Sequence, residues 1–268
     1  MYEFEFIKPS TVGEAVAVVS EDGEAKYLAG GQTLLPTMKQ RLASPSKLVS
    51  VSAIQDIKGV SRVGEELVVG GGTTHAIVAR EAKDAFPALA SLAGRIGDPA
   101  VRNRGTIGGS LANNDPAACY PSAVLACDAT IVTNGREIAA TDFFQGLFTT
   151  SLEESEIITA VRFPVPEAAN YLKFIQPASR FALVGVFVAK FAGRVGVAVT
   201  GASEDGVFRW TEAEELLVES FNPAAVEELV VSPGSMIGDV FGSKDYRAYL
   251  IPVLTARAVQ TIQSGQVS

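Results

Sequence analysis

Two clusters of glycine and polar residues could carry chemistry in this sequence. The first, AGGQTLLPTMKQR, runs from Ala29 to Arg41 and follows the short apolar run KYL. Gly30 and Gly31 lack a Cβ and tolerate positive φ, so the backbone can approach a ligand closely. Where such a turn opens a helix, its N–H groups can converge on an anion, and Thr33 adds a hydroxyl donor. Because glycine pairs also form tight turns, the stretch predicts either an anion-binding turn or an ordinary strand-to-helix turn.

This first turn does not match the common nucleotide-binding signatures. A Rossmann fingerprint reads G-x-G-x-x-G after a strand, and a P-loop reads G-x-x-x-x-G-K-[ST]. The turn GGQT offers neither, and Lys39 lies too far along the expected helix to act as a P-loop lysine. Simple NAD or ATP binding is therefore disfavoured.

The second cluster, RNRGTIGGSLANND, places Gly105, Gly108 and Gly109 among several polar side chains. Two glycine-rich loops suggest a ligand longer than one phosphate, such as a dinucleotide whose pyrophosphate and polyol both need hydrogen-bond donors. Taken alone, RNRG could be a solvated turn and NNDP an Asx-turn that leads into a helix. The joint occurrence of the two clusters favours ligand binding.

Composition limits the other kinds of chemistry. The chain has 268 residues with a formal net charge of −8 and no basic stripe, so nucleic acid is not an expected partner. Cys119 and Cys127 are too few for an iron–sulfur cluster held by four thiolates, and a single His75 leaves no histidine metal site. Neither a Ser/His/Asp set nor a carboxylate pair stands out. We therefore expect neither metal ligands nor catalytic residues in this chain.

The first turn must be positioned by a small βαβ-like unit. Periodicity predicts helices at 11–20 and 34–43 and strands at 25–30 and 47–52. Further along we expect hairpins at 59–72 and 129–140, helices at 76–86 and 122–128, and a closing strand at 156–165. Thr73 or Thr74 could cap the helix at 76–86, and Pro87 is expected to interrupt it.

The second cluster lies in a stretch without regular pattern. Residues 97–121 are rich in Gly, Asn, Asp and Pro and show no sustained period. A long irregular stretch in a compact protein is more often functional than decorative. This part of the chain is therefore a second candidate wall for a ligand site.

The last third of the chain predicts a separate α+β domain. Residues 164–170 form a plausible boundary, and strands at 181–191 and 195–202 alternate with helices at 211–220 and 244–262. The longest apolar run, FALVGVFVAKF, contains Lys190 and is too short for a membrane span. Because the N-terminus shows no signal-peptide pattern, we expect a cytoplasmic protein.

Three segments together carry a family resemblance. The stretches AGGQTLLPTMKQRLASPSKLVSV, VGGGTTH and VRNRGTIGGSLANNDPAACYPSAVLAC closely resemble the FAD-binding medium subunit of molybdenum hydroxylases, the carbon monoxide dehydrogenase and xanthine dehydrogenase flavoprotein family. The resemblance covers nearly the whole chain. It implies an α+β fold with a two-lobed, PCMH-like FAD-binding domain at 1–166, with lobes at about 1–55 and 56–166. A smaller C-terminal domain with an antiparallel sheet, like that of the carbon monoxide dehydrogenase flavoprotein, would occupy 167–268.

The resemblance also implies which residues bind FAD. The first turn would hold the pyrophosphate, the second would lie close to the phosphates, and Asp115 would lie near the polyol or ring. The implied cofactor-binding positions are Ala29, Gly30, Gly31, Gln32, Thr33, Leu34, Thr106, Gly108, Gly109, Ser110, Asp115, Cys119 and Phe181.

The sequence departs from the family pattern near the expected flavin ring. Relatives often read NDPAAD, whereas Cys119 ends the same run here and removes a charged acceptor. Pro177 replaces a basic residue, and Phe181 stands at the ring-facing position. Phe181 could equally be a core aromatic residue, and His75 could either approach the cofactor or begin a helix. Trp210 is expected to serve packing.

The resemblance implies an oxidoreductase subunit that transfers electrons. Reducing equivalents would arrive from an iron–sulfur small subunit, beside a molybdopterin large subunit, and would leave the FAD for a soluble electron acceptor. Membrane and nucleic acid are not expected partners. The alternative is a stand-alone flavin-binding protein without its own turnover, favoured by the changes at Cys119 and Phe181. An independent FAD oxidoreductase is a minor alternative, since no candidate base lies beside the glycine turns.

Overall fold

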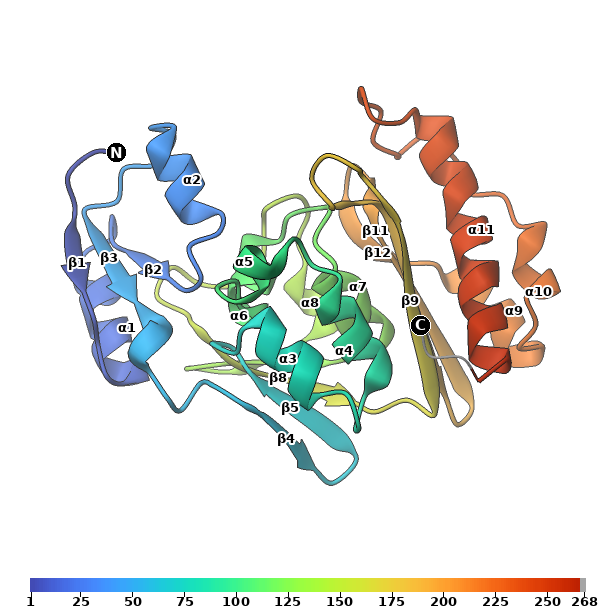
Figure 1. The fold of residues 1–268 in the computed structure, drawn as a ribbon, viewed down its shortest axis with the longest axis horizontal. Coiled ribbons are helices and arrows are strands. Elements are labelled where there is room, and N and C mark those ends of the chain that lie inside the picture. Colours follow the sequence, from blue (N-terminus) through green and yellow to red (C-terminus); the bar gives the residue numbers. More distant parts are fainter. Residues whose placement is uncertain (266–268) are drawn as a thin grey trace.

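The computed structural model describes residues 1–265 and contains three β-sheets that follow one another along the molecule (Figure 1). A three-stranded sheet lies near the N-terminus, a five-stranded sheet lies in the middle, and a four-stranded sheet carries the C-terminal part. Helices pack around each sheet. The structure is therefore a mixed helix and sheet fold, as the sequence predicts.

The N-terminal sheet positions the first glycine turn. Its elements are β1 (Glu5–Ile7), α1 (Val12–Glu21), β2 (Lys26–Leu28), α2 (Leu34–Lys39), β3 (Lys47–Ser50) and the 3-10 turn η1 (Val51–Ala53). The strands are parallel in the order β1-β3-β2. Both helices and both strands expected in this region are confirmed, whereas β1 was not predicted. The first glycine turn joins β2 to α2, at the end of the sheet that faces the centre of the molecule (Figure 1).

The central sheet is antiparallel and carries the second glycine turn. Its strands, in the order β4-β5-β8-β6-β7, are β4 (Val60–Val63), β5 (Glu66–Gly70), β6 (Thr130–Thr133), β7 (Glu137–Ala139) and β8 (Ile158–Pro164). Its helices are α3 (His75–Glu81), α4 (Pro87–Gly94), α5 (Pro99–Arg102), α6 (Ile107–Asn113), α7 (Tyr120–Ala126) and α8 (Ala140–Phe143). Both predicted hairpins, the closing strand and the helix expected at 122–128 are confirmed within a few residues.

Two expectations about this central part are wrong. The stretch 97–121 is not irregular, because it contains α5 and α6. Gly108 and Gly109 lower the helix propensity of α6 and hide this helix from a pattern search. The helix expected at 76–86 already ends at Glu81, although Pro87 does separate two helices as predicted, since it begins the next helix at a position where proline is well tolerated.

The C-terminal sheet is buried on both faces. Its antiparallel strands are β9 (Ala168–Ile175), β10 (Ala182–Phe191), β11 (Arg194–Ser203) and β12 (Gly206–Arg209), and its helices are α9 (Thr211–Glu219), α10 (Ala224–Glu227) and α11 (Lys244–Gln263). On β10, Val184 and Val186 pack in the core beneath α9 and α11, whereas Phe187 packs in the core of the central part. Burial of both faces explains why FALVGVFVAKF reads as one continuous apolar run.

The C-terminal sheet shares a core with the central part. Tyr171, Phe187 and Ala198 belong to the same buried cluster as the side chains of α4 and α7. A Cβ on Gly196 would overlap the carbonyl oxygen of Ala126, so α7 lies directly on β11. The division near residue 166 stays a prediction, and the contact across it is extensive.

Candidate functional site

All the predicted cofactor-binding residues line one cleft of about 600 Å³. Both glycine turns, the segment from Asp115 to Cys119 and the aromatic ring of Phe181 contribute to its walls. The volume lies within the roughly 300–1,000 Å³ that is typical of ligand sites. The structure therefore brings together residues as far apart in the sequence as Ala29 and Phe181.

The two glycine turns touch each other. A Cβ on Gly30 would overlap the carbonyl oxygen of Arg104, which immediately precedes the second turn. Gly31 has a φ of 70°, in the left-handed region that side chains disfavour. The pair thus fulfils two requirements, since Gly30 allows close contact between the turns and Gly31 allows the chain to reverse.

The first turn presents unpartnered backbone donors. Within residues 1–265, the N–H groups of Gly30, Gly31, Gln32 and Thr33 find no hydrogen-bond acceptor. They stand just before α2, where the helix dipole adds partial positive charge. Gln32 Nε2 donates to the carbonyl of Gly30 at 3.3 Å, which steadies the turn. Such a run of donors suits an anion, as the sequence suggests.

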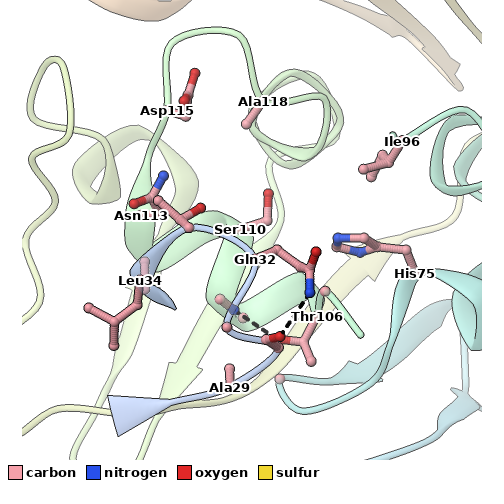
Figure 2. A pocket seen from close by; sticks show the side chains of 18 of the residues that line it. Ala29, Gln32, Leu34, His75, Ile96, Thr106, Ser110, Asn113, Asp115 and Ala118 are labelled. Atoms are coloured by element: carbon pink, nitrogen blue, oxygen red, sulfur yellow. Dashed lines mark hydrogen bonds between the residues drawn. The ribbon is translucent and has the colours of Figure 1, made fainter. Parts of the chain in front are cut away.

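The second turn is built around a helix cap. Thr106 is the N-cap of α6, and its Oγ1 accepts a hydrogen bond from the N–H of Gly109 at 3.1 Å. A Cβ on Gly109 would lie 3.0 Å from Thr106 Oγ1 and 3.3 Å from Ala29 Cβ, so this glycine also faces the first turn. Figure 2 shows Ser110 and Asn113 along α6 and Asp115 beyond its end. Together they give one polar wall of the cleft.

The segment VGGGTTH supports the second turn from behind. The N–H of Gly108 donates to the carbonyl of Gly71 at 2.9 Å, and the N–H of Ile107 donates to that of Thr73 at 3.1 Å. A Cβ on Gly108 would lie 2.6 Å from Gly71 O. These glycines therefore serve close packing of one backbone on another.

Asp115 lines the cleft and is half-buried. Its Oδ1 accepts a hydrogen bond from the N–H of Ala117 at 2.9 Å. Burial raises the pKa of this carboxyl group, while the bond from Ala117 opposes the rise. Behind the segment, Thr200 Oγ1 on β11 lies 2.8 Å from Pro116 O and 2.7 Å from Ala118 O. The C-terminal sheet thus holds this wall in place.

His75 lines the cleft as well, although the sequence left its role open. It begins α3, as one of the two alternatives expected, and its side chain is only 4% exposed. Its ring lies 5.4 Å from that of Tyr120, and its Nδ1 is buried without a partner among the described residues. Burial, with a smaller effect of Arg102, lowers the pKa of His75 to about 4, so the imidazole is neutral at ordinary pH.

The end of the cleft nearest the C-terminal sheet holds Cys119 and Phe181. Cys119 is 5% exposed, and its Sγ lies 3.6 Å from Lys173 Nζ. Phe181 is 49% exposed, so it is not a core residue. Lys173 lines the same end and is not among the cofactor-binding residues predicted from the sequence. Trp210, by contrast, is buried in the C-terminal core, as expected.

Residues 1–265 form neither a metal-binding cluster nor a membrane-spanning helix. Across residues 1–265, no group of three or more His, Cys, Asp or Glu side chains is placed to hold a metal ion. Over the same range, none of the helices has the length and apolar character needed to cross a membrane.

Two glycine turns that touch each other line one large cleft of this fold, and comparison with known proteins identifies the class. The chain belongs to the family of the FAD binding domain in molybdopterin dehydrogenase, whose model matches residues 2–166. It is a FAD-binding medium subunit of the molybdenum hydroxylase type, and FAD is its cofactor.

Several relatives match over almost their full length. The chain is 33% identical to the carbon monoxide dehydrogenase medium chain of Afipia carboxidovorans, over 96% of each chain. It is 33% identical to the nicotine 6-hydroxylase medium subunit of Paenarthrobacter nicotinovorans, over 95% of each. The crystal structure of quinoline 2-oxidoreductase from Pseudomonas putida 86 superposes with a TM-score of 0.88 at 28% identity, covering 100% of this chain and 99% of that one.

Proposed function

We propose that this chain passes electrons from the iron–sulfur clusters of a partner subunit, through FAD, to an external acceptor. The complex would also contain a molybdopterin large subunit. The names of its relatives support this role, because they describe medium chains and subunits of oxidoreductases. FAD supplies the redox chemistry when bound, and the residues of this chain bind and orient it.

The observation that carries the proposal is the meeting of the two turns. In the proposed complex, residues 29–34 hold the pyrophosphate of FAD through the free N–H groups that precede α2. The second turn lies beside the first and lines the cleft next to the phosphates, and Asp115 accepts hydrogen bonds from hydroxyl groups of the cofactor. Backbone donors suit a chain with a net charge of −8, because they act locally and need no basic field.

A matched pair of glycine variants tests this assignment. In Gly109→Leu the new Cβ would enter the space between Thr106 and Ala29, whereas in Gly23→Leu the new Cβ would have no atom within 4 Å. We expect the purified Gly109 variant to lose bound FAD and the Gly23 variant to keep it. Visible absorbance per mole of folded protein, with identification of the released cofactor, measures the difference. Equal FAD content in both variants would contradict the assignment.

Assembly and reduction test the electron route. The chain should co-purify with an iron–sulfur subunit and a molybdopterin subunit, and its flavin should be reduced through the iron–sulfur subunit when the substrate of the complex is added. A yellow chain that associates with neither and is never reduced through such a partner would instead support the stand-alone flavin-binding protein.

A further inference from the structure

The loop between β9 and β10 closes one end of the cleft. Ser179, Arg180 and Phe181 of this loop line the cleft directly. The loop is internally tied, since the N–H of Arg180 donates to the carbonyl of Gln176 at 2.8 Å and the N–H of Gln176 donates to that of Phe181 at 2.9 Å. Arg180 nevertheless has a φ of 64°, an unfavourable conformation for a residue with a side chain. Phe181 is half-exposed, so burial of its ring cannot be what holds the loop in place.

Lys173 connects this loop to the central part of the molecule. Its Nζ donates to the carbonyl of Arg180 at 2.8 Å and to the carbonyl of Arg95 at 2.8 Å, and it lies 3.6 Å from Cys119 Sγ. An ammonium group has three N–H donors, and these contacts use all of them. Hydrogen bonds from a charged donor are stronger than neutral ones. One side chain therefore joins the end of α4, the start of α7 and the loop.

The backbone of Lys173 is fixed within the C-terminal sheet. The position of the loop therefore depends on the lysine side chain, rather than the reverse. Lys173 lies within β9, paired with Gly185 of β10. Its neighbour Tyr171 is buried, and the carbonyl of Tyr171 accepts a hydrogen bond from Arg95 Nη1 at 3.1 Å. Two hydrogen bonds therefore connect β9 to Arg95 at the end of α4, one from the side chain of Arg95 and one to its carbonyl. No carboxylate within the described chain lies within 4.0 Å of Lys173 Nζ, so these contacts do not compete with an ion pair.

We propose that Lys173 is a positioning residue that holds the loop 176–181 over one end of the FAD cleft. The time for which FAD stays bound then depends on Lys173 through the position of Phe181. The proposal rests on the proposed function for its effect on FAD, whereas the effect on the loop itself does not need the cofactor.

The first test measures the release of FAD. Lys173→Met keeps the length of the side chain and removes its donors, and Lys173→Arg restores donors. Lys190→Met is the matched control, because Lys190 lies at the far end of β10, where its Nζ is 5.0 Å from the centre of the Phe221 ring. We expect FAD to leave the Lys173→Met variant roughly tenfold faster, the size of a lost charged hydrogen bond. The rate of FAD release should return part of the way to the wild-type rate in Lys173→Arg and should equal the wild-type rate in Lys190→Met.

The second test measures the loop without cofactor. Trypsin cuts after Arg180, at the carbonyl that Lys173 holds. Cleavage of the folded apoprotein between Arg180 and Phe181 should be faster in Lys173→Met than in Lys190→Met, with no increase at other sites. Unchanged cleavage would overturn the proposal even where FAD binds. A chain that binds no FAD but shows faster cleavage would refute the proposed function alone.

A double-variant cycle tests whether Lys173 acts through the loop. Phe181→Ala should fold normally, because the ring is half-exposed. If Lys173 acts by placing Phe181, the combined Lys173→Met/Phe181→Ala variant should release FAD no faster than the faster single variant. Rate effects that multiply would mean that Lys173 acts independently of Phe181, and would overturn the proposal.

Discussion

Gly30 and Gly31 are adjacent, yet the structure requires glycine at each for a different reason. The conformation of Gly30 would accept a side chain, but its Cβ position is filled by the carbonyl of Arg104. Gly31 has a positive φ, so a side chain there would be strained whatever space it met. The sequence could suggest both roles for the pair. It could not assign them, because the neighbour of Gly30 lies more than seventy residues away.

Burial of His75 should make the free energy of unfolding depend on pH. Its pKa is about 4 in the folded chain and near 6.5 when exposed, so between these values the unfolded chain binds more protons. Stability should therefore fall as pH falls from about 6.5 to about 4, by roughly 3 kcal/mol from this residue. Urea unfolding of the wild type and His75→Gln across this range measures the difference. Parallel pH profiles for the two proteins would contradict the expectation.

At the scale of elements, helices and strands form as predicted where the local sequence pattern is strong. The helices at α1 and α11 and the hairpins of the central sheet carry clear periodicity, and each forms where the sequence predicts it. β1 is only three residues long and largely exposed, so its strand character comes from pairing with β3 rather than from its own pattern. The helix α6 was missed because Gly108 and Gly109 lie in its first turn, where contact between turns matters more than helix propensity.

Two threonine N-caps allow the effect of a cap on helix stability to be distinguished from its effect on FAD binding. Thr11 caps α1 by accepting from the N–H of Glu14 at 3.2 Å, and Thr106 caps α6 by accepting from that of Gly109 at 3.1 Å. Thr11→Ala and Thr106→Ala should each lower the free energy of unfolding by about 1 kcal/mol. Only Thr106→Ala should weaken FAD binding, measured by titration of the apoprotein. Equal FAD affinity in both variants would show that the cap of α6 has no role in the site.

At the scale of the whole molecule, the cleft is assembled from all three sheets. The first turn follows a strand of the N-terminal sheet, and the second lies in the central part. Lys173 lies on β9 of the C-terminal sheet, and Phe181 lies in the loop between β9 and β10. The two turns were predictable because glycine patterns are local. Lys173 was not, since its contacts with Arg95 and Cys119 span more than fifty residues and depend on how the sheets pack.

Thr200 tests the support that the C-terminal sheet gives to the cleft. Thr200→Val keeps the shape of the side chain but removes the hydroxyl group near Pro116 O and Ala118 O. Pro116 O keeps the N–H of Gly201 at 2.7 Å, whereas Ala118 O loses its Thr200 partner. We expect a loss of about 1–3 kcal/mol in the free energy of unfolding and weaker FAD binding, with both restored in Thr200→Ser. Denaturant unfolding and FAD titration measure these effects, and wild-type values in Thr200→Val would contradict them.

The close packing of α7 against β11 limits how this chain can be recombined with its relatives. Gly196 leaves no room for a methyl group beneath the carbonyl of Ala126, and aromatic residues of the C-terminal sheet fill a core that begins before residue 166. A hybrid joined at that boundary would inherit one half of each of these contacts from a different parent. Transplanting the last third would therefore succeed only together with a compatible α7, so the two segments are expected to be exchanged as a unit.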